Sequence, residues 1–378
     1  MAMQKSLSYN QKAQILATDG YDETQYHGAI SPPIFQTAMF SFGKKSSREY
    51  RYTATNNPTF SIVSKKLAAA ESGEACRLFA TGMAAINAVF LSFLKSGDHI
   101  VVSENVYSGV KTSLRNFEKF GVEYTYVSGA ADEIEQAVRP ETRMIYVESP
   151  GSKLFDVLDI EAIGKIGRRL NIMTVIDNTW ATPMFQNPLL YGFDLVIHSA
   201  TKYLGGHSDI MGGAVIGAEK IVSGIHNLGA AMDPHQAWLL NRSLATLPMR
   251  MKHFMENTSI IASFLEAHPK IQKVLYPGLP SHPNYEIGRR FMSGYSSLLS
   301  FITAGDYEQS RQVMERLKII RKAWSYGGPT SLAFHYGKEF RRSLERLGYP
   351  PNLIRLHVGF EDPDAIMEEL DYALQAIT

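Results

Sequence analysis

The chain has 378 residues, 45% of them hydrophobic and 20% charged, which is typical of a globular protein large enough for two domains. Its 38 Lys and Arg residues nearly balance 37 Asp and Glu residues, so the net charge of +1 favours neither nucleic acid nor a membrane as a partner. The single cysteine, Cys76, excludes an intramolecular disulfide. Since the first residues also lack the apolar segment of a signal peptide, we expect a cytoplasmic protein.

The first 58 residues are polar and contain two turn signals, "SPPIF" (31–35) and "TNNPTF" (55–60). We expect an extended N-terminal arm over 1–58 that lies on the main domain or on a neighbouring subunit.

From 59 to 247, short apolar runs alternate with amphipathic helical stretches. This alternation predicts an α/β domain with a mainly parallel sheet and helices on both faces. We expect strands at 99–103, 122–127, 143–149, 171–177 and 194–198, and helices at 106–120 and 159–170.

Residues 248–378 have the pattern of a smaller α+β domain. We expect strands at 271–276, 297–302 and 353–358, and helices at 250–268 and 363–376. The domain boundary is therefore expected near 247–248.

Ligand sites in such sheets lie beyond the carboxyl ends of the strands, so the residues that follow each strand are the candidates for a site. The first candidate is "CRLFATGMAAINAVF" (76–90), which predicts a strand, a turn at Thr81–Gly82 and a helix that begins near Met83. Free backbone amides at a helix start, next to a glycine, suit an anion. The tract matches neither a Walker loop nor a dinucleotide fingerprint.

Three further residues follow strands in order. Tyr107 comes after the strand at 99–103, where a tyrosine either packs or stacks on a planar ligand. Asp177 ends an apolar strand; it is either an N-cap or a buried carboxylate that needs a cationic partner. Lys202 follows the next strand in "HSATKYLGGHSD", between the hydroxyls of Ser199 and Thr201 and a run of glycines.

An anion site, an aspartate and a lysine in this order predict pyridoxal phosphate as a cofactor. Its aldehyde needs a lysine with which to form a Schiff base, and its ring nitrogen needs a carboxylate that keeps it protonated. Its phosphate needs amides and hydroxyls, for which the candidates are Gly82, Met83, Ser199 and Thr201.

The chain resembles the Cys/Met-metabolism family of fold-type I pyridoxal-phosphate enzymes, the cystathionine synthases and lyases. The motifs that carry this resemblance include "ATGMAAI", "VIDNTWATP", "HSATKYLGGHSD", "WSYGGPTSL" and "LIRLHVGFED". It runs from about residue 15 to the C-terminus, and it implies a seven-stranded sheet domain with a smaller C-terminal domain.

The resemblance also implies a role for each matching residue. Lys202 would form the Schiff base, Asp177 would pair with the ring nitrogen, and Tyr107 would stack on the ring and assist proton transfer. Arg355, with Ser325 nearby, would bind the substrate α-carboxylate, a task that suits a planar guanidinium. Tyr52 would reach the phosphate of a neighbouring subunit, which implies at least a homodimer and usually a tetramer. No metal is expected.

Three positions depart from the family pattern. Ala54, in "YTATNNPT", stands where the family commonly has a phosphate-binding arginine. Ser152 replaces a frequent asparagine, and Thr330 replaces a glutamate that many members carry. The first change affects the cofactor, and the other two affect the substrate.

The wording of several motifs looks closest to β-lyases, which also carry an aromatic residue at the position of Tyr326. We therefore expect a carbon–sulfur lyase that converts cystathionine or a similar amino acid to pyruvate, ammonia and a thiol. The alternative is γ-elimination or γ-replacement, as in cystathionine γ-synthase, O-acetylhomoserine sulfhydrylase and the γ-lyases. An aminotransferase and a non-catalytic relative are alternatives of other classes.

Overall fold

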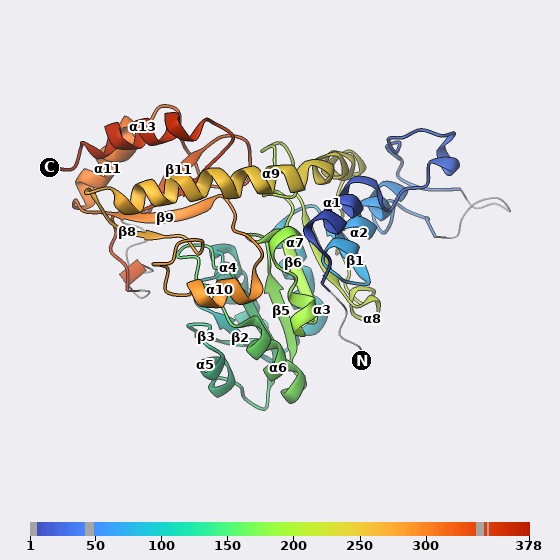
Figure 1. Ribbon diagram of the computed structural model, residues 1–378. Coiled ribbons are helices and arrows are strands. Elements are labelled where there is room, and N and C mark those ends of the chain that lie inside the picture. The colour runs from blue at the N-terminus through green and yellow to red at the C-terminus, as the bar shows by residue number, and fades with distance from the viewer. Residues whose placement is uncertain (1–5, 42–48, 338–343, 346–347) are drawn as a thin grey trace.

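A computed structural model describes residues 6–41, 49–337, 344–345 and 348–378 (Figure 1). The larger of its two sheets contains β1 (Ala75–Phe79), β2 (His99–Ser103), β3 (Glu123–Val127), β4 (Thr142–Glu148), β5 (Met173–Asp177), β6 (Leu195–Ser199) and β7 (Gly213–Gly217). The strands lie in the order β1-β7-β6-β5-β4-β2-β3. All are parallel to their neighbours except β7, which runs antiparallel to both β1 and β6. The expected mainly parallel, seven-stranded sheet is confirmed.

The strands expected from apolar runs in this sheet are all present, with ends that shift by no more than two residues. β7 was not predicted. Its sequence, "GAVIG", begins and ends in glycine, a residue that is depleted in strands, so the local pattern resembles a loop. Pairing on both sides, with β1 and β6, keeps this short segment extended.

Helices cover both faces of the larger sheet, as expected. α3 (Gly82–Phe93) and α4 (Ser108–Glu118) pack on one face, which includes Ile100 and Val102. α5 (Ala131–Gln136) and α6 (Ile160–Leu170) pack on the other face, to which Val101 points. Successive side chains of a strand point to opposite faces, so strands buried on both sides are apolar throughout.

The smaller sheet contains β8 (Ile271–Leu275), β9 (Leu298–Thr303), β10 (Arg321–Lys322), β11 (Leu332–His335) and β12 (Leu353–His357), in the order β10-β11-β12-β9-β8. α10 (Tyr285–Phe291), α11 (Tyr307–Arg316) and α13 (Pro363–Leu374) belong to the same part of the chain. The expected α+β character is confirmed, although β10, β11, α10 and α11 were not predicted.

The long helix α9 (Pro234–Ala267) extends from the N-terminal helices to the smaller sheet (Figure 1). It begins at residue 234 and not near 250 as expected, because Asp233 caps it and Pro234 occupies its first position. A second proline, Pro248, lies inside the helix, just before the start that was expected near residue 250. α9 passes through residues 247–248, so the domain division expected there remains a prediction.

The N-terminal segment is not extended throughout, and the expectation is wrong for α1 (Tyr9–Thr18). Ser8 and Gln11 form a capping box that starts this helix, and its Leu16 is fully buried in the main core. Other helical elements in the described part of the chain include a 3₁₀ turn (Glu23–Tyr26), α2 (Pro58–Ala70), α7 (Thr182–Phe185), a second 3₁₀ turn (Pro188–Tyr191) and α8 (Glu219–Val222). Within the described ranges, no helix combines the length and apolar character needed to cross a membrane.

Candidate active site

A cavity of about 410 Å³ lies at the carboxyl ends of β4, β5 and β6, where residues of the smaller domain close it. All the predicted site residues line this cavity except Tyr52. Its lining comprises Thr81, Gly82, Met83, Ile86, Tyr107, Ser108, Glu148, Ser152, Lys153, Asp177, Thr179, Ser199, Thr201, Lys202, Trp324, Ser325, Tyr326, Tyr336 and Arg355.

The start of α3 forms one end of the cavity. The Thr81 hydroxyl accepts a hydrogen bond from the Ala84 N–H (3.0 Å) and caps the helix. Gly82 is pressed against the end of β6: a Cβ at this position would lie 2.9 Å from the Ser199 Cβ. The first amides of a helix have no partner within it, so this end of the cavity can bind an anion such as a phosphate.

Asp177, at the end of β5, is only 6% exposed. Its Oδ1 accepts hydrogen bonds from the Thr179 N–H (2.9 Å) and hydroxyl (2.5 Å). Burial raises the pKa of Asp177, whereas the Thr179 bonds and the nearby His198 and Lys202 oppose that rise. A buried carboxylate in this position favours a cationic ligand atom.

Lys202 lies in the turn after β6, and its Nζ donates to the Ser325 hydroxyl (2.8 Å). The ammonium also lies 5.0 Å from the centre of the Tyr326 ring. Burial, assisted by the charge of Arg355, lowers the pKa of Lys202 to about 8, although Asp177 opposes this change. An amine with such a pKa is partly neutral near pH 7 and can act as a base or nucleophile.

Ser325 has φ +117°, a backbone conformation that residues other than glycine rarely adopt. The backbone that follows Ser325 packs closely against the turn after β6, since a Cβ on Gly327 would lie 2.7 Å from the backbone nitrogen of Tyr203. Strain of this kind persists only where the surrounding structure enforces it, and here it directs the hydroxyl of Ser325 toward Lys202.

Tyr107 and Arg355 line two other sides of the cavity. Tyr107 is the residue before α4 and is 50% exposed; its ring lies against Gly109, where a Cβ would come within 2.5 Å of it. Arg355 is in the middle of β12, and its guanidinium is 5.8 Å from the centre of the Phe334 ring. The cavity thus combines an aromatic wall with a cation suited to a carboxylate.

Tyr52 lies on the N-terminal segment and is 52% exposed. Its backbone forms an isolated bridge with Met39, and it does not line the cavity of its own chain. In Figure 1 this segment projects away from the sheets. The neighbouring Ala54 accepts a hydrogen bond at its carbonyl from the side chain of Asn227.

Sequence reasoning missed Glu148, Trp324 and Tyr336 as lining residues. The rule that found Asp177 also applies to Glu148, because this residue lies at the end of the expected strand 143–149. No local signal identified Trp324 or Tyr336, because the packing of the smaller domain brings them to the cavity.

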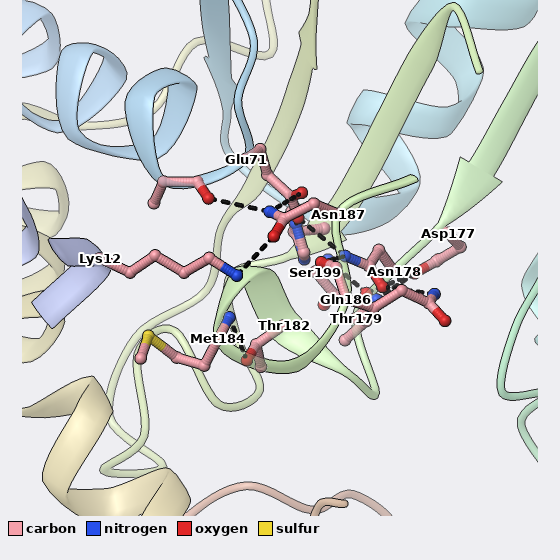
Figure 2. Close-up of polar contacts among 12 residues, drawn as sticks. Lys12, Glu71, Asp177, Asn178, Thr179, Thr182, Met184, Gln186, Asn187 and Ser199 are labelled. Carbon is pink, nitrogen blue, oxygen red and sulfur yellow. Dashed lines mark hydrogen bonds and ion pairs between the residues drawn. The ribbon is translucent and has the colours of Figure 1, made fainter. Parts of the chain in front are cut away.

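Figure 2 shows a buried polar network next to Asp177. Lys12 of α1 donates to the Asn187 side chain, whose amide donates to Glu71 (3.2 Å). Glu71 also accepts from Asn178 (2.8 Å), the residue after Asp177, and contacts His198 (2.5 Å), the residue before Ser199. Through Asn178, this network holds the start of the loop after β5 in place.

Comparison with known proteins finds related sequences over nearly the whole chain. The family described as "Cys/Met metabolism PLP-dependent enzyme" matches residues 13–375. A cystathionine γ-lyase of Bacillus subtilis (strain 168) is 36% identical, over 97% of this chain and 100% of its own length. An L-methionine γ-lyase of Pseudomonas putida is 35% identical, over 94% and 95% of the two chains.

Two solved structures resemble the whole chain. The crystal structure of metB from Corynebacterium glutamicum has a TM-score of 0.92 and 33% identity, and covers 98% of this chain and 99% of that one. Cystathionine γ-synthase from Xanthomonas oryzae pv. oryzae, solved with aminoacrylate and cysteine, has a TM-score of 0.92 and 30% identity, with 97% and 98% covered.

Proposed function

The chain belongs to the Cys/Met metabolism family of PLP-dependent enzymes, and from this premise we propose that it cleaves or exchanges the bond at Cγ of a sulfur amino acid. Its cofactor is pyridoxal phosphate. The observation that carries the proposal is the position of Lys202, a partly neutral amine in one cavity with Asp177 and Arg355.

The cavity fits this cofactor. Residue 82 lies so close to Ser199 that there is no room for a side chain. Because Gly82 has none, the first amides of α3 stay accessible to a phosphate. Among the described residues, the hydrogen bonds to Asp177 all fall on Oδ1, which leaves Oδ2 for a protonated ring nitrogen. When bound, pyridoxal phosphate supplies an electron sink that stabilises negative charge at the substrate Cα.

We assign the following roles. The amides of Gly82 and Met83 bind the phosphate with the hydroxyls of Ser199 and Thr201. Asp177 keeps the ring nitrogen protonated, and Tyr107 stacks on the ring. Arg355 and Ser325 bind the substrate carboxylate, so that the Cα proton faces Lys202. The Lys202 amine, once neutral, would accept that proton; in γ-chemistry it would have to release this proton before it accepts a second one from Cβ.

The names of the relatives favour γ-chemistry. The relatives described above that align over nearly the whole chain are named cystathionine γ-lyase, L-methionine γ-lyase and cystathionine γ-synthase. β-Elimination is the second candidate, because Tyr326 lines the cavity beside Lys202, where an aromatic ring narrows the space around the substrate.

The test is an analysis of products. The cofactor-loaded protein is incubated with methionine, cystathionine, cystine and O-acetylhomoserine, the last with and without cysteine, and the keto acids are separated by chromatography. We expect 2-oxobutyrate or a γ-replacement product to dominate. Pyruvate alone would support β-elimination, and transfer of the amino group to an added keto acid would support an aminotransferase.

In this proposal the active unit is a homo-oligomer in the cytoplasm. It is at least a dimer and, as is usual in the family, a tetramer. The projecting segment supports it: Tyr52 is half exposed and does not line its own cavity, as expected of a residue that contacts the phosphate of a partner subunit. Sedimentation of the protein at several concentrations measures the oligomeric state.

A further inference from the structure

Two carboxyl groups lie side by side in the cavity. Glu148 and Asp177 end adjacent parallel strands, β4 and β5, and are register partners. Both line the cavity, and Glu148 is 7% exposed. Two carboxylates that are close together and shielded from water repel each other, so one of them tends to keep a proton.

The surrounding hydrogen bonds indicate which of the two keeps the proton. Asp177 accepts two bonds from Thr179, and the charges of His198 and Lys202 also favour its ionised form. Burial, reinforced by the charge of Asp177, raises the pKa of Glu148 to about 8. At neutral pH we therefore expect Asp177 to be ionised and Glu148 to be neutral.

Other charged and titratable groups face Glu148 from every neighbouring element. Nearby cations lower the pKa of Glu148, but burial and the negative charge of Asp177 raise it by more. These groups are Asp177 of β5, Lys153 after β4, Lys202 after β6, Arg355 of β12 and the tyrosines Tyr107, Tyr146, Tyr326 and Tyr336.

The two oxygens of Glu148 have different partners. Oε2 accepts a hydrogen bond from the backbone N–H of Tyr107 (2.6 Å), so the proton of the neutral acid belongs on Oε1. The Ser152 hydroxyl donates to Oε1 when Glu148 is ionised, and a proton on Oε1 reverses the direction of that hydrogen bond. Ser152 is half-buried and lines the cavity. When Glu148 donates to the Ser152 oxygen, Ser152 can donate its own proton into the cavity. When Glu148 is ionised, Ser152 must donate back to it and offers the cavity only a lone pair.

We propose that Ser152, held by neutral Glu148, donates a hydrogen bond to an anionic oxygen of the bound ligand, and that loss of the Glu148 proton reverses this polarity. Glu148 is a positioning residue in this pair, and Ser152 is the residue that contacts the ligand. The anionic oxygen belongs either to the cofactor ring or to the substrate carboxylate. The inference rests on the pyridoxal-phosphate site described above and not on the identity of the sulfur substrate.

The test measures the affinity of the apo-protein for pyridoxal phosphate between about pH 6.5 and 9.5, in the wild type, Glu148→Gln and Ser152→Ala. If the oxygen belongs to the cofactor, wild-type affinity should fall roughly tenfold as Glu148 ionises, a change typical of a hydrogen bond to a charged group. Glu148→Gln should keep its neutral-pH affinity throughout, because the amide donates to Ser152 while its carbonyl accepts from Tyr107. Ser152→Ala should be weak at every pH.

Lys202 also titrates near pH 8, but its effect has the opposite sign, because the neutral amine binds the cofactor aldehyde. Since Lys202 is present in both proteins, the ratio of wild-type to Glu148→Gln affinity at each pH isolates the contribution of Glu148. Glu135→Gln makes the same chemical change at a surface ion pair with Arg169 and should match the wild type.

The substrate arm measures KM at the two ends of the same pH range. A difference between wild type and Glu148→Gln in KM alone assigns the oxygen to the substrate, and a difference in cofactor affinity assigns it to the cofactor. The proposal is overturned if Glu148→Gln loses affinity at neutral pH or retains a wild-type alkaline fall. It is also overturned if Ser152→Ala changes neither quantity, a result that stands even if Glu148→Gln does not fold. Cofactor binding can be measured whether or not the protein proves to be a γ-lyase.

Discussion

At the scale of single residues, Lys202 is surrounded by groups that act on its charge in opposite directions. Burial and Arg355 lower its pKa to about 8, whereas Asp177 stabilises the ammonium. The hydroxyl of Ser325 holds the amine in place. A lysine that is fully solvated would be almost entirely protonated near pH 7 and would be a poor base.

We predict that Lys202→Ala folds but does not show the visible absorbance of lysine-bound cofactor. Turnover should fall by at least about 100-fold, as is usual when a general base is removed. Lys119→Ala, at an exposed position, is the control and should retain both properties. Unchanged absorbance and turnover in Lys202→Ala would assign the role to another amine.

A second prediction concerns Ala54, at the position where the family commonly has an arginine. An arginine here adds a charged donor for the phosphate, so Ala54→Arg should tighten cofactor binding by roughly 1–3 kcal/mol. Retention of the cofactor during dialysis measures the change, and Ala54→Met controls for side-chain length. Equal or faster loss from Ala54→Arg would mean that another group already neutralises the phosphate.

At the scale of elements, the phosphate end of the cavity depends on how closely α3 approaches β6. Thr81 caps the helix, and Gly82 lies directly against Ser199. The close approach brings the helix amides and the hydroxyl at the end of β6 to the same anion. A side chain at residue 82 would separate the two elements.

Gly82→Ala should therefore weaken cofactor binding at least about tenfold and destabilise the fold by about 1–3 kcal/mol, the usual cost of overpacking. Its Cβ would lie 2.9 Å from the Ser199 Cβ and 3.0 Å from the Ser199 Oγ. Cofactor titration and urea unfolding measure the two effects. At Gly224 the nearest atom to an added Cβ is 3.4 Å away, so Gly224→Ala should be tolerated. If both variants bind cofactor like the wild type, the close approach does not shape the phosphate site.

Elements also differ in how well their own sequences predict them. β2, β4, β5 and β6 contain continuous apolar runs, and burial on both faces explains that composition; β3, at the edge of the sheet, is only partly buried. By contrast, β7 begins and ends in glycine, and the start of α9 lies far upstream of its internal proline. For β7, pairing with β1 and β6 supplies the stability that the local sequence lacks, whereas α9 has its own start signals in Asp233 and Pro234.

At the scale of the whole molecule, one apolar cluster joins α1, α2, α9 and the smaller sheet; it includes Leu16, Leu67, Leu240 and Leu356. The polar network of Figure 2 crosses the same region, from Lys12 through Asn187 to Glu71 and Asn178. The N-terminal helix is thereby linked to the loop that follows Asp177.

Lys12→Met should lower the free energy of unfolding by about 1–3 kcal/mol, because the Asn187 oxygen loses its donor inside the protein. Burial lowers the pKa of Lys12, so its charge already opposes folding, and this limits the loss. Urea unfolding at pH 7 measures the change. Lys165→Met removes an exposed ion pair with Glu161 and should cost less than about 0.5 kcal/mol. Equal costs in the two variants would show that the buried network does not stabilise the fold.

The sequence by itself determined where most strands of the larger sheet lie along the chain and which residues end them, although it did not identify β7 or the order of the strands in the sheet. Apolar runs are local, and parallel strands present their carboxyl ends at one edge, so the sequence is sufficient to group Gly82, Asp177 and Lys202. This grouping was enough to predict pyridoxal phosphate. Arg355, Ser325 and Tyr326 came from the family resemblance, because no local pattern assigns residues of the smaller domain to this cavity.

Only the tertiary structure decided which groups act on one another. The pairing of β4 with β5 puts Glu148 beside Asp177, and the packing of the smaller domain brings Ser325 to Lys202. The same structure keeps Tyr52 away from its own cavity. Strand register and domain packing arise from contacts between residues far apart in the chain. The pKa values near 8 of Glu148 and Lys202 follow from those contacts and from burial, which a local sequence pattern does not contain.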